Sequence, residues 1–158
     1  MVVFKGSRAV ILQKPTTNLN LVISKLFTVG ASNFTPLPAG MMKSIDLLVE
    51  QIRRNPDLVP VLIMITDGIV NIPLDQPISL RGRKTYGNSA QGDAVDLARK
   101  LVSAGIRTVV INTDHREEEK LPLIWKGHVE LKPTAFLIEL ARITGGRYFG
   151  LQTIRVTS

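Results

Sequence analysis

The feature that most constrains the fold is a short apolar run, Val61–Ile65, that ends on Thr66, Asp67 and Gly68. A continuous apolar run of this length is typical of a parallel strand that is covered on both faces. We therefore predict a buried strand over Val59–Thr66. Its carboxylate then lies at the carboxyl end of the strand, where open α/β sheets bind their ligands.

A second apolar run, Thr108–Thr113, follows the first after one helical segment. Apolar residues at helical spacing between Ala94 and Val102 predict the helix, and Gly105 ends it. A strand, a helix and a strand in this order build a parallel sheet with a right-handed crossover. The sequence therefore predicts an α/β fold.

The remaining segments extend this pattern at both ends of the chain. We predict an antiparallel pair of strands, a helix whose stripe Leu19, Val22, Ile23 and Leu26 packs on one face and which ends at Gly30, and a helix capped by Thr35 with Pro36 in its first turn. A last helix and a last strand close the chain, and two irregular loops interrupt it. The predicted ranges are 2–4 and 9–12 for the pair, 135–143 for the last helix, 147–151 for the last strand, and 71–89 and 114–132 for the loops.

Composition narrows the class of protein. With 158 residues and 44% hydrophobic content, the chain fits one domain over residues 1–158. The absence of cysteine excludes disulfides and thiolate metal sites. The net charge is +7, but the basic residues bunch only in Ser79–Asn88 and aromatic residues make up 5%, which argues against a nucleic-acid partner. No apolar run approaches the ~18 residues of a membrane span, and no leader is visible, so we expect a soluble, cytoplasmic protein without a membrane partner.

Several motifs, taken in order, carry a resemblance. The segment GASNFTPLPAGM is followed by LIMITDGIVNIPL, then by GDAVDLARKLVSAGIRTVVINTD and LIELARITGGRYFGLQ. This order resembles the von Willebrand factor A (VWA) domain, and more narrowly its version in the D subunit of magnesium and cobalt chelatases. The resemblance implies a three-layer, open and mostly parallel Rossmann-like sheet with one antiparallel edge strand.

The resemblance also implies a functional site. VWA domains use a metal-ion-dependent adhesion site, in which a D-x-S-x-S motif joins a Thr and a second Asp around Mg²⁺, and an acidic residue of a partner completes the shell. Thr35 matches the loop threonine and Asp67 the second aspartate. Gly68 and Asn71 match positions that shape the turn, and we predict that both contribute to partner binding. Separately from the resemblance, the basic residues Arg81, Arg83 and Lys84 of the loop either dock an acidic partner or belong to a solvated surface loop.

The chain departs from the family in one respect. It has no D-x-S-x-S motif, and it begins where the family's second strand ends, so the first strand and first helix are absent. Loss of that central strand would leave unpaired sheet edges. Three explanations stay open: the sequence is truncated at its N-terminus, the strand comes from another chain, or the halves pair directly and the metal site is lost.

The resemblance implies one class of function, and the residues themselves leave a second one open. The first is a non-catalytic interaction module of a chelatase D-like subunit, which recruits partners, such as AAA+ chelatase subunits, for ATP-dependent metal insertion into a tetrapyrrole. Without a G-x-x-x-x-G-K-[ST] motif, the chain itself would bind no ATP. The second is a small metal-dependent α/β hydrolase that uses Asp67 and Asp114. A simpler alternative makes Asp67 a turn residue and Thr35 an ordinary helix cap, on a scaffold with a vestigial site.

Overall fold

The computed structural model divides into two compact units, and each is described by itself. Unit 1 comprises Met1–Pro56 and Val70–Leu97, and unit 2 comprises Asp57–Ile69 and Ala98–Ser158. That residues 1–158 form one domain stays a prediction. The structure describes the following residues: 1–30, 35–74, 79–80, 83–84, 89–114, 122–125 and 128–151.

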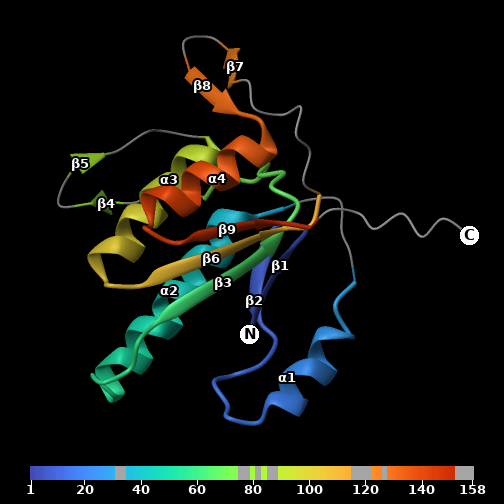
Figure 1. Ribbon diagram of the computed structural model, residues 1–158, viewed down its shortest axis with the longest axis vertical. Coiled ribbons are helices and arrows are strands. Elements are labelled where there is room, and N and C mark those ends of the chain that lie inside the picture. Colours follow the sequence, from blue (N-terminus) through green and yellow to red (C-terminus); the bar gives the residue numbers. More distant parts are fainter. Residues whose placement is uncertain are drawn as a thin grey trace, which may run out of the picture. The chain divides into compact units, whose positions relative to one another are not determined.

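Unit 1 opens with the predicted antiparallel pair, β1 (Val2–Lys5) and β2 (Arg8–Ile11) (Figure 1). Lys5 lies opposite Arg8, so Gly6 and Ser7 alone make the turn. Gly6 has φ +61°, a conformation that L side chains rarely adopt and that a tight hairpin turn of this kind requires. The Gly-Ser pair therefore fixes the register of the hairpin.

Helix α2 (Leu37–Arg54) packs on this hairpin and buries its apolar face. Gly40 lets the helix approach closely, because a Cβ there would lie 2.5 Å from the ring of Phe4. The prediction that Thr35 caps the helix is wrong: Pro36 occupies the cap position and no side chain caps the first turn. The reason is chemical, since a cap at Thr35 would rely on N–H groups in the first turn and Pro38 has none to donate.

Helix α1 (Leu19–Leu26) forms where it was predicted, and the Asn18 side chain accepts a hydrogen bond from the Leu21 N–H. The predicted packing of its apolar stripe is wrong, because α1 has no buried residue. Leu19 is 68% exposed and Phe27, just beyond the helix, is 86% exposed. The predicted end at Gly30 is also too late, since the helix stops at Leu26.

The predicted loop 71–89 is only partly irregular. It contains a two-residue antiparallel pair, β4 (Ser79–Leu80) and β5 (Arg83–Lys84), which is too short to leave a periodic pattern in the sequence. Helix α3 (Ala90–Ser103), which spans both units, follows it. Ser89 begins α3 by accepting a hydrogen bond from the Gly92 N–H at 2.9 Å.

Asp93, in the first turn of α3, is a buried carboxylate. It is 5% exposed, and its Oδ2 accepts a hydrogen bond from the Leu74 N–H at 2.7 Å. Burial raises the pKa of Asp93 above its ordinary value of 3.8; the bond from Leu74 lowers it in part, and repulsion from Asp96 raises it further. The folded state therefore binds a proton more readily at this site than the unfolded chain does.

This shift predicts a pH dependence of stability. Between pH 3.8 and the raised pKa, the folded state holds more protons than the unfolded state, so the contribution of Asp93 to the free energy of unfolding falls as pH rises. We expect the Asp93→Asn variant to lose this component. Urea unfolding of both proteins from acidic to neutral pH measures the difference, and parallel curves would contradict the prediction.

Unit 2 contains a parallel sheet of three strands, in the order β3 (Val61–Thr66), β6 (Arg107–Asn112) and β9 (Arg147–Gly150) (Figure 1). Both central apolar runs are thus strands, as predicted. The observed ends of these strands differ from the predicted ends by at most two residues. Helix α4 (Pro133–Ile143) packs on β6 and β9. The core residues on α4 are Phe136, Leu137, Leu140 and Ala141.

The prediction that β3 is covered on both faces is wrong. Met64 is 4% exposed, but Ile63 is 60% and Ile65 is 53% exposed. The strand lies at one end of the sheet, with β6 as its neighbour. Since side chains alternate along a strand, one face of β3 is buried and the other is open.

The second predicted loop, 114–132, also contains strands. β7 (Pro122–Trp125) pairs with β8 (His128–Leu131) as an antiparallel hairpin, so the prediction of an irregular segment is wrong there. A proline at the first position of a strand is tolerated, and β-branched or aromatic residues favour the pairing. Among the described residues, no helix is long and apolar enough to cross a membrane.

Candidate functional site

The carboxyl end of β3 is a tight polar turn. Asp67 Oδ1 accepts a hydrogen bond from the Ile69 N–H at 3.1 Å, and Thr66 Oγ1 accepts one from the Gly68 N–H at 3.2 Å. Thr66 is 7% exposed, whereas Asp67 is half-buried. The turn therefore holds the Asp67 carboxylate at the carboxyl end of the sheet.

Gly68 fixes where this turn lies. Its φ is +82°, and a Cβ there would meet the Pro133 carbonyl oxygen at 2.9 Å and Leu137 at 3.0 Å. Only glycine combines this backbone conformation with such a close approach to the start of α4. The prediction that Gly68 shapes the turn agrees with this geometry, although its role in partner binding stays a prediction.

Asn112, at the end of β6, is a polar residue that the sequence analysis missed. It is fully buried, and its Nδ2 donates to Tyr148 Oη at 3.0 Å and to Thr134 Oγ1 at 3.3 Å. Its Oδ1 accepts a hydrogen bond from the Asp114 N–H at 2.9 Å. Asn112 thus ties β6 to β9 and α4 at the carboxyl end of the sheet. The sequence signal that could have indicated Asn112 is a single amide side chain at the end of an apolar run.

The alternative pair, Asp67 and Asp114, lies on neighbouring strands. Thr66 is in register with Asn112, and the Thr113 N–H donates to the Thr66 carbonyl oxygen at 3.0 Å. Both carboxylates therefore follow strand ends at one edge of the sheet, as predicted. No group of three or more His, Cys, Asp or Glu side chains that could hold a metal occurs among the described residues.

This donor set does not fit a complete Mg²⁺ site within either unit. Mg²⁺ prefers an octahedral shell of hard oxygen ligands. In unit 2 the turn offers one carboxylate oxygen of Asp67, and the Thr66 hydroxyl is engaged by Gly68. Thr35 belongs to unit 1, and its role as a second ligand stays a prediction.

Thr35 and Asn71 meet in unit 1. The Thr35 N–H donates to Asn71 Oδ1 at 2.9 Å, across 36 residues of sequence. The two loop positions named from the sequence are thus joined, with Asn71 holding the backbone in front of α2. Arg81 lies outside the described residues, and so do the side chains of Arg83 and Lys84 on β5. Their docking role stays a prediction.

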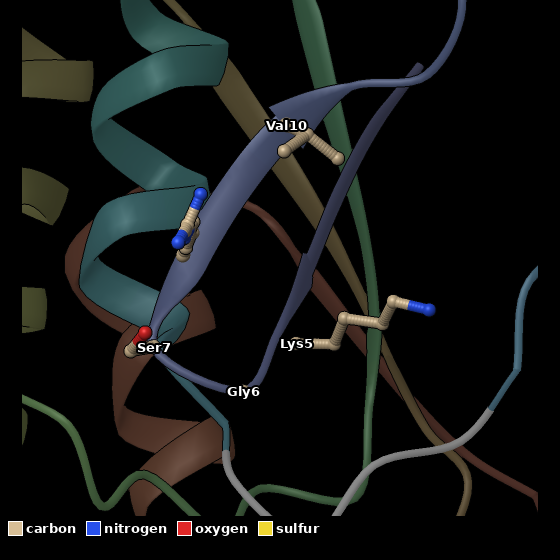
Figure 2. Close-up of a pocket in the computed structure, with 5 residues that line it drawn as sticks. Lys5, Gly6, Ser7 and Val10 are labelled. Carbon is tan, nitrogen blue, oxygen red and sulfur yellow. The ribbon is translucent and has the colours of Figure 1, made fainter.

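A shallow hollow of about 400 Å³ lies at the β1–β2 turn, lined by Lys5, Gly6, Ser7, Arg8 and Val10 (Figure 2). The side chains of Lys5 and Ser7 point to opposite sides of the turn. Lys5 and Arg8 are both exposed. The polar groups do not converge on one ligand, so we assign no site to this hollow.

Two curated proteins that resemble the chain are magnesium-chelatase subunits. The 60 kDa subunit of Rhodobacter capsulatus and the 67 kDa subunit of Chlorobaculum parvum are each 24% identical over 151 residues, which is 96% of this chain and 22% of each relative. An uncharacterized protein of Methanocaldococcus jannaschii is 24% identical over 114 residues, 72% of the chain and 59% of that protein. The chain thus spans less than two thirds of each relative. No family model matches it.

Two solved structures share the fold. BatB from Bacteroides thetaiotaomicron superposes with a TM-score of 0.60 at 17% identity, over 96% of this chain and 69% of BatB. The chain has a VWA-like fold. An aerotolerance-related membrane protein from Bacteroides fragilis gives a TM-score of 0.54 at 18% identity, over 97% of this chain and 71% of that one. The predicted α/β class is therefore confirmed, and the antiparallel strands of the described residues lie in separate pairs, β1–β2, β4–β5 and β7–β8.

Proposed function

We propose that this VWA-like chain is a protein-interaction module of a magnesium- or cobalt-chelatase D-like subunit. Its role would be recruitment of AAA+ chelatase subunits for metal insertion into a tetrapyrrole, without catalysis of its own. The similarity to two magnesium-chelatase subunits over 96% of the chain supports this class of complex. It also supports a VWA-like domain of the chelatase type.

The observation that carries the proposal is the half-buried Asp67 carboxylate at the end of the parallel sheet. The carboxylate accepts a hydrogen bond from the Ile69 N–H, and Thr66 Oγ1 accepts one from the Gly68 N–H, so both side chains are held in one turn. A pre-organised polar group at a sheet end suits recognition, because little conformational freedom is lost on binding. We place the partner's acidic residue near Asp67, and a Mg²⁺ held between the two carboxylates would reconcile their like charges.

Around this centre, we propose that Asn71 holds the adjoining loop in place and that Arg81, Arg83 and Lys84 contact acidic residues of the partner. The hydrogen bond from Thr35 to Asn71 supports the first role. The clustering of basic residues in Ser79–Asn88, in a chain of net charge +7, supports the second.

The test is binding to the AAA+ chelatase subunits encoded in the same genome, measured by biolayer interferometry with Mg²⁺ and with EDTA. We expect Asp67→Asn to weaken binding by roughly tenfold or more, since it removes a charge-assisted contact at the centre of the interface. Asp46→Asn, on the exposed face of α2, is the matched control and should bind like the parent chain.

Three results decide between the alternatives. Equal binding by the parent chain and Asp67→Asn would overturn the role of Asp67. Binding that is unchanged by EDTA would overturn the Mg²⁺ bridge but keep the interaction. Metal-dependent hydrolysis that is lost equally in Asp67→Asn and Asp114→Asn would favour the hydrolase in place of the interaction module.

A further inference from the structure

The first turn of α3 holds both ends of the loop 71–89. Ser89 begins the helix by accepting a hydrogen bond from the Gly92 N–H at 2.9 Å. Asp93 Oδ2, in the same turn, accepts one from the Leu74 N–H at 2.7 Å, across 19 residues of sequence. We call Leu74, Ser89 and Asp93 the base of the loop. All three residues belong to unit 1, so the base lies within one compact unit.

The start of the loop is fixed at a second point. Asn71 Oδ1 accepts a hydrogen bond from the Thr35 N–H at 2.9 Å, just before α2 begins. The segment 71–74 is therefore held at one end by the residue that leads into α2 and at the other end by Asp93 of α3. Side chain-to-backbone bonds of this kind give an irregular segment a defined path, because they supply partners that no helix or sheet provides.

The buried position of Asp93 is not explained by α3 alone. Asp93 is 5% exposed, and burial of a carboxylate costs free energy unless hydrogen bonds or opposite charges compensate. Burial raises the pKa of Asp93, and repulsion from Asp96 raises it further. An acidic side chain in the first turn gains from the helix dipole without being buried. The buried position instead brings the carboxylate to Leu74, which lies outside the helix.

The loop that this base closes carries the short pair β4–β5. Ser79 lies opposite Lys84 and Leu80 opposite Arg83, and within the described part of the chain no third strand joins the pair. An isolated two-stranded hairpin is at best marginally stable in water. Fixing both ends of a loop removes many of the conformations that its interior would otherwise adopt. The base therefore limits the positions that β4 and β5 can take.

We propose that Asp93 is a positioning residue: it holds Leu74, closes the base of the loop and presents the basic β4–β5 pair to an acidic surface of the partner protein. The basic residues of this stretch are Arg81, Arg83 and Lys84. A charged element that is already ordered loses less conformational freedom on binding, and opposite charges guide the encounter. The acidic partner surface rests on the proposed function, whereas the closed base of the loop does not.

The closed base is tested on the full chain without a partner, by hydrogen exchange of the Leu74 amide. Asp93→Ala removes the oxygen acceptor, whereas Asp93→Asn removes the same charge and keeps an acceptor. We expect exchange at Leu74 to be roughly tenfold faster in Asp93→Ala and close to the parent rate in Asp93→Asn. Ile45→Val, which trims a buried side chain of α2, controls for general destabilisation. Parent-like exchange in Asp93→Ala, or equal acceleration in either control variant, would overturn the proposal.

The presentation of the pair is tested by biolayer interferometry with the AAA+ subunit that we propose as the partner. Leu74→Pro is a second variant, which removes the N–H donor and leaves α3 unchanged. Asp93→Ala and Leu74→Pro should each weaken binding roughly tenfold, whereas Asp93→Asn should bind like the parent chain. Parent-like binding by Asp93→Ala and Leu74→Pro would overturn the positioning role. A parent chain that does not bind would overturn the proposed function, and the exchange rates then decide whether Asp93 holds the loop.

Discussion

Substitution of Gly146 by alanine should lower the free energy of unfolding by about 3 kcal/mol or more. Gly146 lies between α4 and β9, and a Cβ there would meet the Thr108 carbonyl oxygen at 2.0 Å. That atom belongs to the backbone of β6, so no side-chain rotation relieves the overlap. Strand β9, which begins directly after Gly146, can accept the methyl group only by moving away from β6. This movement would disturb the β6–β9 pairing.

Gly145 provides the matched control for this prediction. It has φ +61°, but a Cβ at this position would meet no heavy atom within 4 Å, so Gly145→Ala adds backbone strain without a clash. That strain costs about 1 kcal/mol. Urea unfolding of the two variants measures both values. Equal losses would show that the Gly146–Thr108 approach does not constrain the sheet.

Replacement of Asn112 by leucine should lower the free energy of unfolding by about 3 kcal/mol, since each buried hydrogen bond contributes about 1 kcal/mol. Leucine has a similar volume but removes the bonds to Thr134, Tyr148 and Asp114 together. Because Asn112 is fully buried, water cannot replace the lost partners. The loss should therefore exceed that of a single hydrogen bond.

Tyr148→Phe separates one of these bonds from the rest. It removes the phenolic oxygen that accepts from Asn112 and keeps the aromatic ring, so a loss of about 1 kcal/mol is expected. Chemical denaturation of both variants gives the comparison. Parent-like stability of Asn112→Leu would contradict the role of Asn112 in joining β6, β9 and α4.

The parallel strands β3 and β6 were predictable because each lies in a short, continuous and mainly apolar run of sequence. The runs around Val61–Ile65 and Thr108–Thr113 are strands, with α3 between them, and their register is parallel. Helix α4 was predictable from its periodicity and from the glycines that follow it. These signals are local, so they do not depend on which segments pack together.

What the sequence analysis missed depends on long-range packing or on very short elements. The stripe of α1 predicted a helix but could not name what would cover it, and Leu19 and Leu26 are exposed. The exposed face of β3 was missed for the same reason. A continuous apolar run indicates a strand but does not show which segments cover its two faces. The β4–β5 pair is too short to leave a periodic pattern in the sequence. The β7–β8 hairpin was missed because Pro122, at the start of β7, argued against a strand there.

The candidate site was predicted in part for the same reason. Asp67 and Gly68 could be singled out because they directly follow an apolar strand, and the structure shows them in one hydrogen-bonded turn. The joining of Thr35 to Asn71 spans 36 residues, and the motifs that placed both in one site came from the resemblance. The position of Asn112 at the end of an apolar run was the only local signal, and its role depends on Thr134 and Tyr148, which are distant in the sequence.

The most direct test of the central claim is the hydrogen-exchange footprint of the chain in the presence of the AAA+ partner that we propose. If the chain recruits partners through the carboxyl end of its parallel sheet, the amides of 66–71 and of 112–114 should become protected on binding. The exposed surface of α4, marked by Ile138, should not change. Protection of the α4 surface with no change at 66–71 would contradict the account.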